Sequence, residues 1–196
     1  YEAANLFGVS MKGLTGEAST FINKMETLLG IDPTEAMNNM ATIQGLTTSF
    51  GMASDKAYVL SKNLTQLGYD LASLKNIPVA ESFTKIQAAI SGELEPIRRL
   101  GVDLSQARLQ QELLNLGYSQ SVSTLSQADK AVLRYIAIMK QTTDAQGDFA
   151  RTLSSPANMI RILQAQLNSL AHFMSFQSCE SYNDFLLRER QLRSLY

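Results

Sequence analysis

The sequence is short of residues that carry chemistry: it has one cysteine, one histidine and no tryptophan. Cys179 cannot form an internal disulfide, so the fold does not depend on oxidation and fits a reducing compartment. A structural zinc site needs about four Cys or His ligands, more than the chain contains. His172 is the only imidazole available to a Ser-His-acid triad, and its helical setting favours an ordinary surface or core role. We therefore predict no catalytic residue, no metal site and no cofactor.

Charge of one sign and long apolar runs are also missing. Seventeen basic and eighteen acidic residues leave a formal net charge of -1, which argues against nucleic-acid binding. The strongest apolar run, residues 132–139, contains Arg134 and is far shorter than the roughly 20 residues that cross a bilayer. The sequence thus predicts no membrane span. Because the chain begins with Tyr1, we expect it to be a piece of a longer protein.

Aromatic residues are few, at 8 %, and valine is scarce, while Ala, Leu, Gln, Met and Ser are plentiful. This composition favours helices over sheets. No stretch alternates apolar and polar residues for long enough to predict a strand. We predict an all-α fold: an irregular helical bundle with one long heptad-patterned segment and several short helices.

The heptad-patterned segment lies between residues 43 and 74, where apolar residues recur at alternating steps of three and four. Glycine is a poor helix former, so a bend or break is expected near Gly51. Few charges flank the seam, which favours an antiparallel hairpin within one bundle over an intermolecular coiled coil, although the second remains open. The seam positions are Ile43, Leu46, Phe50, Ala53, Ala57, Leu60, Leu64, Leu67, Leu71 and Leu74.

Local signals predict where helices begin and end. Asp32 before Pro33, Ser126 before Asp129 and Ser155 before Pro156 are typical helix starts. Pro78 should end the heptad segment. Glycine follows each of three short periodic runs, around 79–91, 94–100 and 105–116, where a left-handed closing residue is needed. These glycines are Gly92, Gly101 and Gly117. The last long helix should present one apolar face made of Ile160, Leu163, Leu167, Leu170 and Met174.

Four segments, in order, resemble one protein family. They are NLT at 63–65 with DLAS at 70–73, SGELEPIRRLGV at 91–102, LSQADKA at 125–131 with Arg134-Tyr135, and TDAQGDFART at 143–152 with Ala157-Asn158 and Arg161. Their order and spacing are similar to the N-terminal helical region of phage tail tape measure proteins. The resemblance covers residues 41–171. Residues 1–40 form a weakly defined helical lead-in, and residues 172–196 diverge.

The resemblance implies structural roles for its residues. The motif glycines free the backbone for tight reversals, Gly147-Asp148 should stop one helix and cap the next, and Pro96 should start a helix. Arg98 and Arg99 are expected to make intramolecular bonds, with a binding role as the alternative. The full set is Asp70, Gly92, Glu93, Pro96, Arg98, Arg99, Gly101, Lys130, Arg134, Gly147, Asp148, Arg151, Asn158 and Arg161.

Past Ala171 the family continues with an apolar, proline-bearing stretch, whereas residues 175–180 here read SFQSCE. We interpret residues 172–196 as a divergent tail that is either frameshifted or disordered, with a terminal helix. A nucleotide sequence whose alternative frame lacks the family pattern would remove the frameshift hypothesis.

The resemblance implies a function in assembly. Family members lie inside the tail tube, determine tail length and assist tail assembly, so the expected partners are tube and tail-assembly proteins, with self-association as an option. The expected location is the virion tail, and the bacterial cytoplasm during assembly. Two alternatives stay open: a tape measure chain with a peptidoglycan-lytic domain outside these residues, and a cellular helical binding module.

Overall fold

The computed structural model describes residues 12–156, 158–160 and 162–163, and within them every regular element is a helix. The predicted all-α class is therefore confirmed. The helices are α2 (Lys12–Leu29), α3 (Pro33–Ser49), α4 (Ser54–Leu74), α5 (Val79–Ser91), α6 (Glu95–Arg98), α7 (Gln106–Asn115), the 3-10 helix η1 (Val122–Thr124), α8 (Gln127–Gln141) and α9 (Asp148–Arg151).

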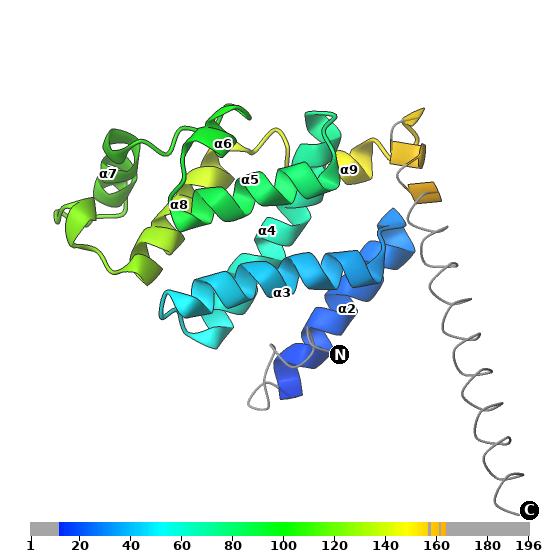
Figure 1. Ribbon diagram of the computed structural model, residues 1–196, viewed down its shortest axis with the longest axis horizontal. Coiled ribbons are helices and arrows are strands. Elements are labelled where there is room, and N and C mark those ends of the chain that lie inside the picture. The colour runs from blue at the N-terminus through cyan, green and yellow to red at the C-terminus, as the bar shows by residue number, and fades with distance from the viewer. Residues whose placement is uncertain (1–11, 157, 161, 164–196) are drawn as a thin grey trace, which may run out of the picture.

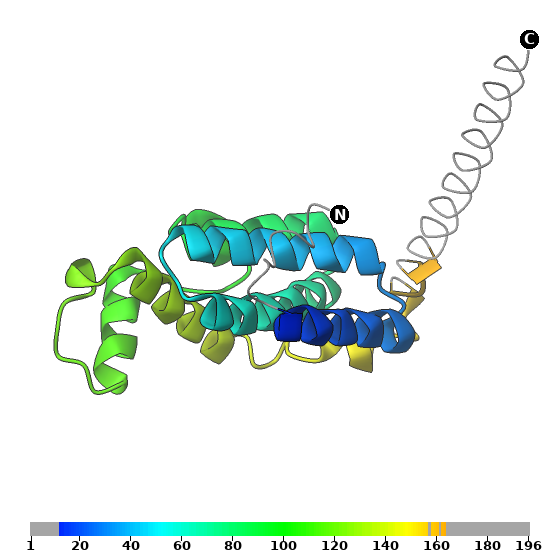
Figure 2. The same ribbon diagram turned by 90° about the horizontal axis from the view of Figure 1, so that it is seen from below.

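Helix α4 is the central element, since it packs against α3, α5 and α9. Figure 1 shows α3 and α5 running across α4, and Figure 2 shows these two helices in one layer with α2 and α4 in another. Helix α7 packs against both η1 and α8, at one end of the molecule. The start of the last segment, residues 158–160 and 162–163, lies beyond α9 at the opposite end.

The predicted helix starts are present. Asp32 Oδ1 accepts hydrogen bonds from the amides of Thr34 at 2.8 Å and Glu35 at 3.0 Å, and Pro33 is the first residue of α3. Ser126 Oγ accepts from the amide of Asp129 at 3.1 Å at the start of α8. Each bond pairs an amide that has no partner within its own helix.

The predicted glycine turns are also present. Gly92, Gly101 and Gly117 have φ of 110°, 92° and 87°, in the left-handed region that other residues rarely adopt. Gly92 closes α5, and its amide bonds to the Ala88 carbonyl at 3.0 Å. Sequence-local chemistry therefore accounts for these helix boundaries.

The heptad-patterned segment is divided into two helices. Helix α3 ends at Ser49, Gly51 has a φ of 87°, and α4 begins at Ser54, so the break expected near Gly51 is confirmed. Helix α4 then turns back and packs against α3, which it crosses obliquely (Figure 1). The ten predicted seam positions do not form one continuous stripe, because Ala53 and Leu74 are exposed while Leu60, Leu64, Leu67 and Leu71 are buried.

Helices α4 and α5 approach each other closely. A Cβ atom on Gly68 would lie 2.6 Å from Phe83 Cζ, so the missing side chain lets the ring approach the α4 backbone. Ser82 Oγ donates to the Gly68 carbonyl at 2.8 Å in the same contact. Tyr69 packs edge-on against Phe83 and Phe149, with ring centroids 5.3 and 6.2 Å apart. Three helices thus meet around one aromatic cluster.

The lead-in of residues 12–40 belongs to this core as well. Ala18, Ile22 and Met25 of α2 are buried among the residues of the main hydrophobic cluster. Helix α3 runs through the predicted boundary at residues 40 and 41, with Met40 and Ala41 both buried. The predicted divergent tail, residues 172–196, lies outside the described residues.

Candidate functional site

Asp70 ties α4 to the loop before α9. Its side chain is 1 % exposed, with Oδ2 accepting from the Gly147 amide at 2.9 Å and Oδ1 from the Phe149 amide at 3.2 Å. Burial raises the pKa of the Asp70 carboxyl above its ordinary value, and the bonds from Gly147, Phe149 and Gln66 offset part of that rise. Both carboxylate oxygens therefore accept hydrogen bonds that hold α4 against this loop.

A second polar cluster lies one helical turn further along α4. Ser73 Oγ donates to Asp148 Oδ2 at 2.7 Å, and Asn158 Nδ2 donates to Ser73 Oγ at 2.9 Å. Asn158 also donates to Thr152 Oγ1 at 2.8 Å. Asp148 and Asn158 are buried and have lost contact with water. Each of these hydrogen bonds therefore gives a partner to a polar group that would otherwise be costly to bury. We name these residues, with Asp70 and Gly147, the α4–α9 polar network.

The predicted role of Gly147 needs correction. Helix α8 ends at Gln141, well before Gly147, so this glycine does not stop that helix. Gly147 instead precedes α9 with a φ of 77°, and Asp148 is the first residue of α9. Arg151 closes the same turn by donating to the Gln146 carbonyl at 2.7 Å. The segment matters because it presents amides to Asp70.

Arg134 and Gly92, which belong to different motifs, meet in space. Arg134 Nη1 donates to the Ile90 carbonyl at 2.9 Å, near the C-terminal end of α5. A Cβ atom on Gly92 would lie 2.8 Å from Arg134 Nη2, so the guanidinium occupies space that a side chain would need. Burial lowers the pKa of Arg134, and the partial negative charge of the helix end favours the cation there.

The remaining motif residues lie nearer the surface. Arg98 pairs with Glu95 at 3.2 Å, with both side chains more than half exposed, and Arg99 is exposed. Lys130 Nζ donates to the Ser123 carbonyl at 3.3 Å. Pro96 lies in the first turn of α6, and the Glu93 amide bonds to the Ala88 carbonyl at 2.9 Å. Arg161 is outside the described residues.

The described residues contain no group of three or more His, Cys, Asp or Glu side chains able to hold a metal ion. None of their helices is long and apolar enough to cross a membrane. His172 and Cys179, the two residues weighed as reactive groups, lie outside the part that the structure describes.

One ion cluster was not predicted from the sequence. Glu112 of α7 is 2 % exposed and pairs with Arg108 at 2.9 Å and with Lys140 of α8 at 2.7 Å. The hydrogen bond from Lys140 lowers the pKa of Glu112, and the charge of Arg108 adds to the effect. The Arg108–Glu112 pair is predictable, because residues four apart are neighbours on a helix surface. The contact between Glu112 and Lys140 is not, because it depends on how α7 packs against α8.

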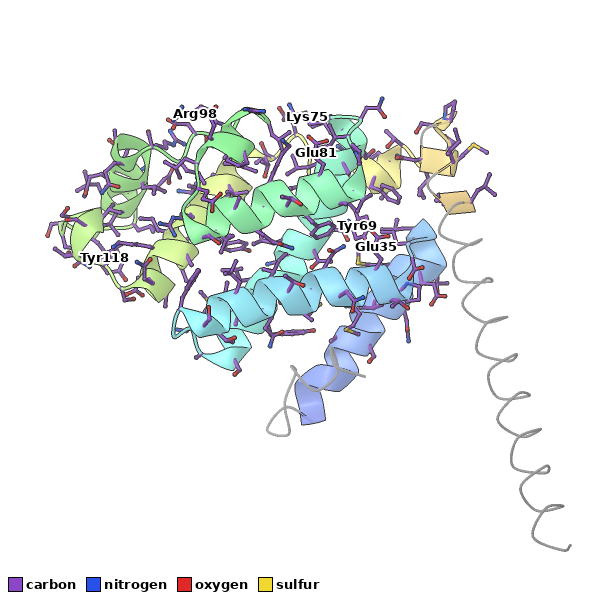
Figure 3. All side chains as sticks on the ribbon, in the orientation of Figure 1. Glu35, Tyr69, Lys75, Glu81, Arg98 and Tyr118 are labelled. Carbon is purple, nitrogen blue, oxygen red and sulfur yellow. The ribbon has the colours of Figure 1, made fainter. Side chains whose placement is uncertain are left out.

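An apolar hollow was missed as well. Its volume is about 490 Å³, and it lies between α7, the following loop and one face of α8. Leu116 and Tyr118 on its wall are 43 % and 55 % exposed, and Figure 3 shows Tyr118 at this end of the molecule. We name it the α7–α8 groove. Its lining residues are Leu113, Leu116, Tyr118, Gln120, Leu125, Asp129, Val132, Leu133 and Ile136.

At the opposite end, Ile162 fixes the start of the last helical segment. A Cβ atom on Gly30 would lie 2.6 Å from Ile162 Cγ2, so Ile162 fills space left by that glycine. Ile162 lines a hollow of about 40 Å³ together with Glu35 and Tyr69, whose neighbouring positions Figure 3 shows. Burial raises the pKa of Glu35, and the charge of Asp32 adds to the rise.

No protein-family model, curated protein or solved structure matches this chain. The resemblance described above therefore depends on the motifs themselves.

Proposed function

We propose that this chain is a structural and assembly component of the tail of a phage, prophage or related injection particle, of the tape measure class. It acts by packing helices and not by catalysis. One observation carries the proposal: residues from all four motifs, Asp70, Gly147 and Asn158 in one cluster and Gly92 with Arg134 in another, make long-range contacts. This is the behaviour expected of positions that maintain a fold.

The described part of the chain is a folded region and not a ruler. A ruler needs a long continuous helix, because each residue adds about 1.5 Å regardless of its identity. Helix α4 has only 21 residues, and the chain turns at both of its ends. We therefore propose that this region engages tail-assembly partners, while length is measured by other residues of the full protein.

The test is to purify tailed particles from the bacterium that carries the gene and to search them for peptides of this chain by mass spectrometry. We expect the peptides in the tail fraction, and we expect an in-frame deletion of α5 to abolish tails. Absence of the chain from purified tails, together with normal tails in the deletion strain, would contradict the proposal.

The α7–α8 groove favours a second candidate, a cellular helical binding module. Grooves of this kind accept an apolar helix face, and such binding does not require a phage tail. Neighbouring genes for tube and baseplate proteins would count against this candidate, and their absence would count for it.

A further inference from the structure

We infer that residues 105–125 form a hinged arm, made of α7, the loop after it and η1, which opens away from α8 as one unit and is held closed by the Glu112–Lys140 ion pair. This inference does not depend on the proposed function. It rests on three observations: the arm is tied together internally, its main contact with the rest of the protein is with α8, and that contact is only partly filled.

The arm is tied together by the side chain of Gln110 in α7. Its Nε2 donates to the Gln120 carbonyl at 2.9 Å, and its Oε1 accepts from the Val122 amide at 3.0 Å. The Tyr118 amide donates to the Leu113 carbonyl at 3.2 Å, which closes the turn after α7. Helix α7 and η1 also pack directly against each other. The arm can therefore move as one piece.

Outside the arm, α7 packs mainly against α8, and Figure 1 shows it at the end of the molecule, apart from α3 and α4. Leu113 is buried and lies across the groove from α8. The carboxylate of Glu112 lies 2.7 Å from Lys140 Nζ, and Lys130 Nζ donates to the Ser123 carbonyl at 3.3 Å. Opening the arm therefore breaks one apolar contact and two contacts with lysines, without disturbing the α3–α4–α5 core.

The hinges lie at the two ends of α8. Gln141, the last residue of α8, accepts from the Asp103 amide at 2.9 Å and donates to the Asp103 carbonyl at 2.8 Å. Val102 and Leu104, on either side of Asp103, are both buried. At the other end, the arm is followed directly by Ser126, the N-cap of α8. Both ends of the arm are thus fixed, while the helix between them is held by the contacts of α7.

The α7–α8 groove shows that the contact between the arm and α8 is only partly filled, since it encloses about 490 Å³. Leu116 and Tyr118 on its wall are already largely exposed, so opening uncovers little more of their surface. The charge of Glu112 regains water when the arm opens, which offsets part of the lost attraction to Lys140. Opening should therefore cost less free energy than unfolding the α3–α4–α5 core.

Opening the arm widens the groove into a larger apolar surface. Val132, Leu133 and Ile136 of α8 line the groove, and Leu133 is only 3 % exposed when the arm is closed. The Glu112–Lys140 ion pair therefore controls how much of this face of α8 reaches solvent.

Hydrogen exchange of the native 196-residue chain, resolved by residue, tests whether the arm is one unit. We expect the amides of Leu116 and Tyr118 in α7 and its turn, and of Thr124 in η1, to exchange through one common opening. Amides inside α4 and α5 should be protected roughly tenfold or more strongly than these. The inference fails if the arm exchanges only when α4 and α5 do, or if α7 and η1 open with unrelated equilibria.

Lys140→Met tests what holds the arm closed. It should reduce protection of α7 and η1 together by roughly tenfold, because it removes a charged hydrogen bond to a buried carboxylate, and it should leave α4 and α5 unchanged. The matched control is Lys75→Met, which removes the same charge from an exposed residue at the end of α4, away from the arm (Figure 3). That variant should exchange like wild type. An arm that is as protected in Lys140→Met as in wild type, or equal losses in α4 and α7, would overturn the inference.

Discussion

At the scale of single residues, the fold depends on two kinds of position. One kind must be glycine, because a neighbouring side chain fills the space beside it. At the other kind, a buried carboxylate accepts hydrogen bonds at both oxygens. Gly68 is of the first kind, because Phe83 occupies the space beside it, 2.6 Å from the position of a Cβ. Asp70 is of the second kind, because it accepts two amide hydrogen bonds from residues 77 and 79 positions away. Each position joins segments that are distant in sequence.

Gly68→Ala should destabilise the protein by about 1–3 kcal/mol, since the buried Phe83 ring must move to admit a methyl group. Urea unfolding followed by circular dichroism gives the free energy. The matched control is Gly16→Ala in α2, where a Cβ would meet nothing within 4 Å. That change should leave stability unaltered or raise it by about 0.5–1 kcal/mol. Equal effects of the two substitutions would contradict this account of Gly68.

Asp70→Asn should also destabilise by about 1–3 kcal/mol, because an amide cannot accept at both positions and leaves the Gly147 or Phe149 amide without a partner. Thermal unfolding measures the loss. Asp144→Asn is the control, since the Asp144 side chain is exposed in the same loop. If both variants melt alike, the α4–α9 polar network does not stabilise the fold as described.

At the scale of elements, helix α7 is attached to α8 through the buried carboxylate of Glu112. The pKa of this group is lowered by Lys140 and Arg108, so its stabilising contribution is present above the ordinary value of 4.5 and is lost as pH falls through the lowered value. Asp70 has the opposite sign. Its raised pKa means that ionisation costs stability as pH rises from the ordinary value of 3.8 toward the raised one.

Hydrogen exchange of the α7 amides tests the Glu112 attachment. Glu112→Gln should weaken protection of α7 near neutral pH by an amount equivalent to roughly 1.5–3 kcal/mol, since it removes hydrogen bonds between charged groups. Acidification through the lowered pKa should reduce protection in wild type and change it little in the variant. Protection in α7 that is identical in both proteins at every pH would refute the assignment.

Elements also show how much a sequence predicts. Caps and glycine turns were predictable because the interacting groups are two to four residues apart, as in Asp32 with Thr34 and Glu35. The Asp70 contacts and the Glu112–Lys140 pair were not, because they join residues separated by 28 to 79 positions. The α7–α8 groove was missed for the same reason, since its walls come from two helices and a loop. The helix-stopping role predicted for Gly147 is wrong because α8 already ends at Gln141.

At the scale of the whole molecule, residues from separate motifs converge on α4 and its neighbours. These interior contacts join segments that are distant in sequence and explain how the chain holds one shape.

We propose that the motif positions serve tail assembly by holding the fold. Electron microscopy of tails, made across a range of temperatures by bacteria whose full-length gene carries Asp70→Asn, tests it most directly. The account predicts that tails disappear at the temperature where the purified variant unfolds, while Asp144→Asn behaves as wild type. Normal tails above that temperature, or tails lost while the variant is still folded, would contradict it.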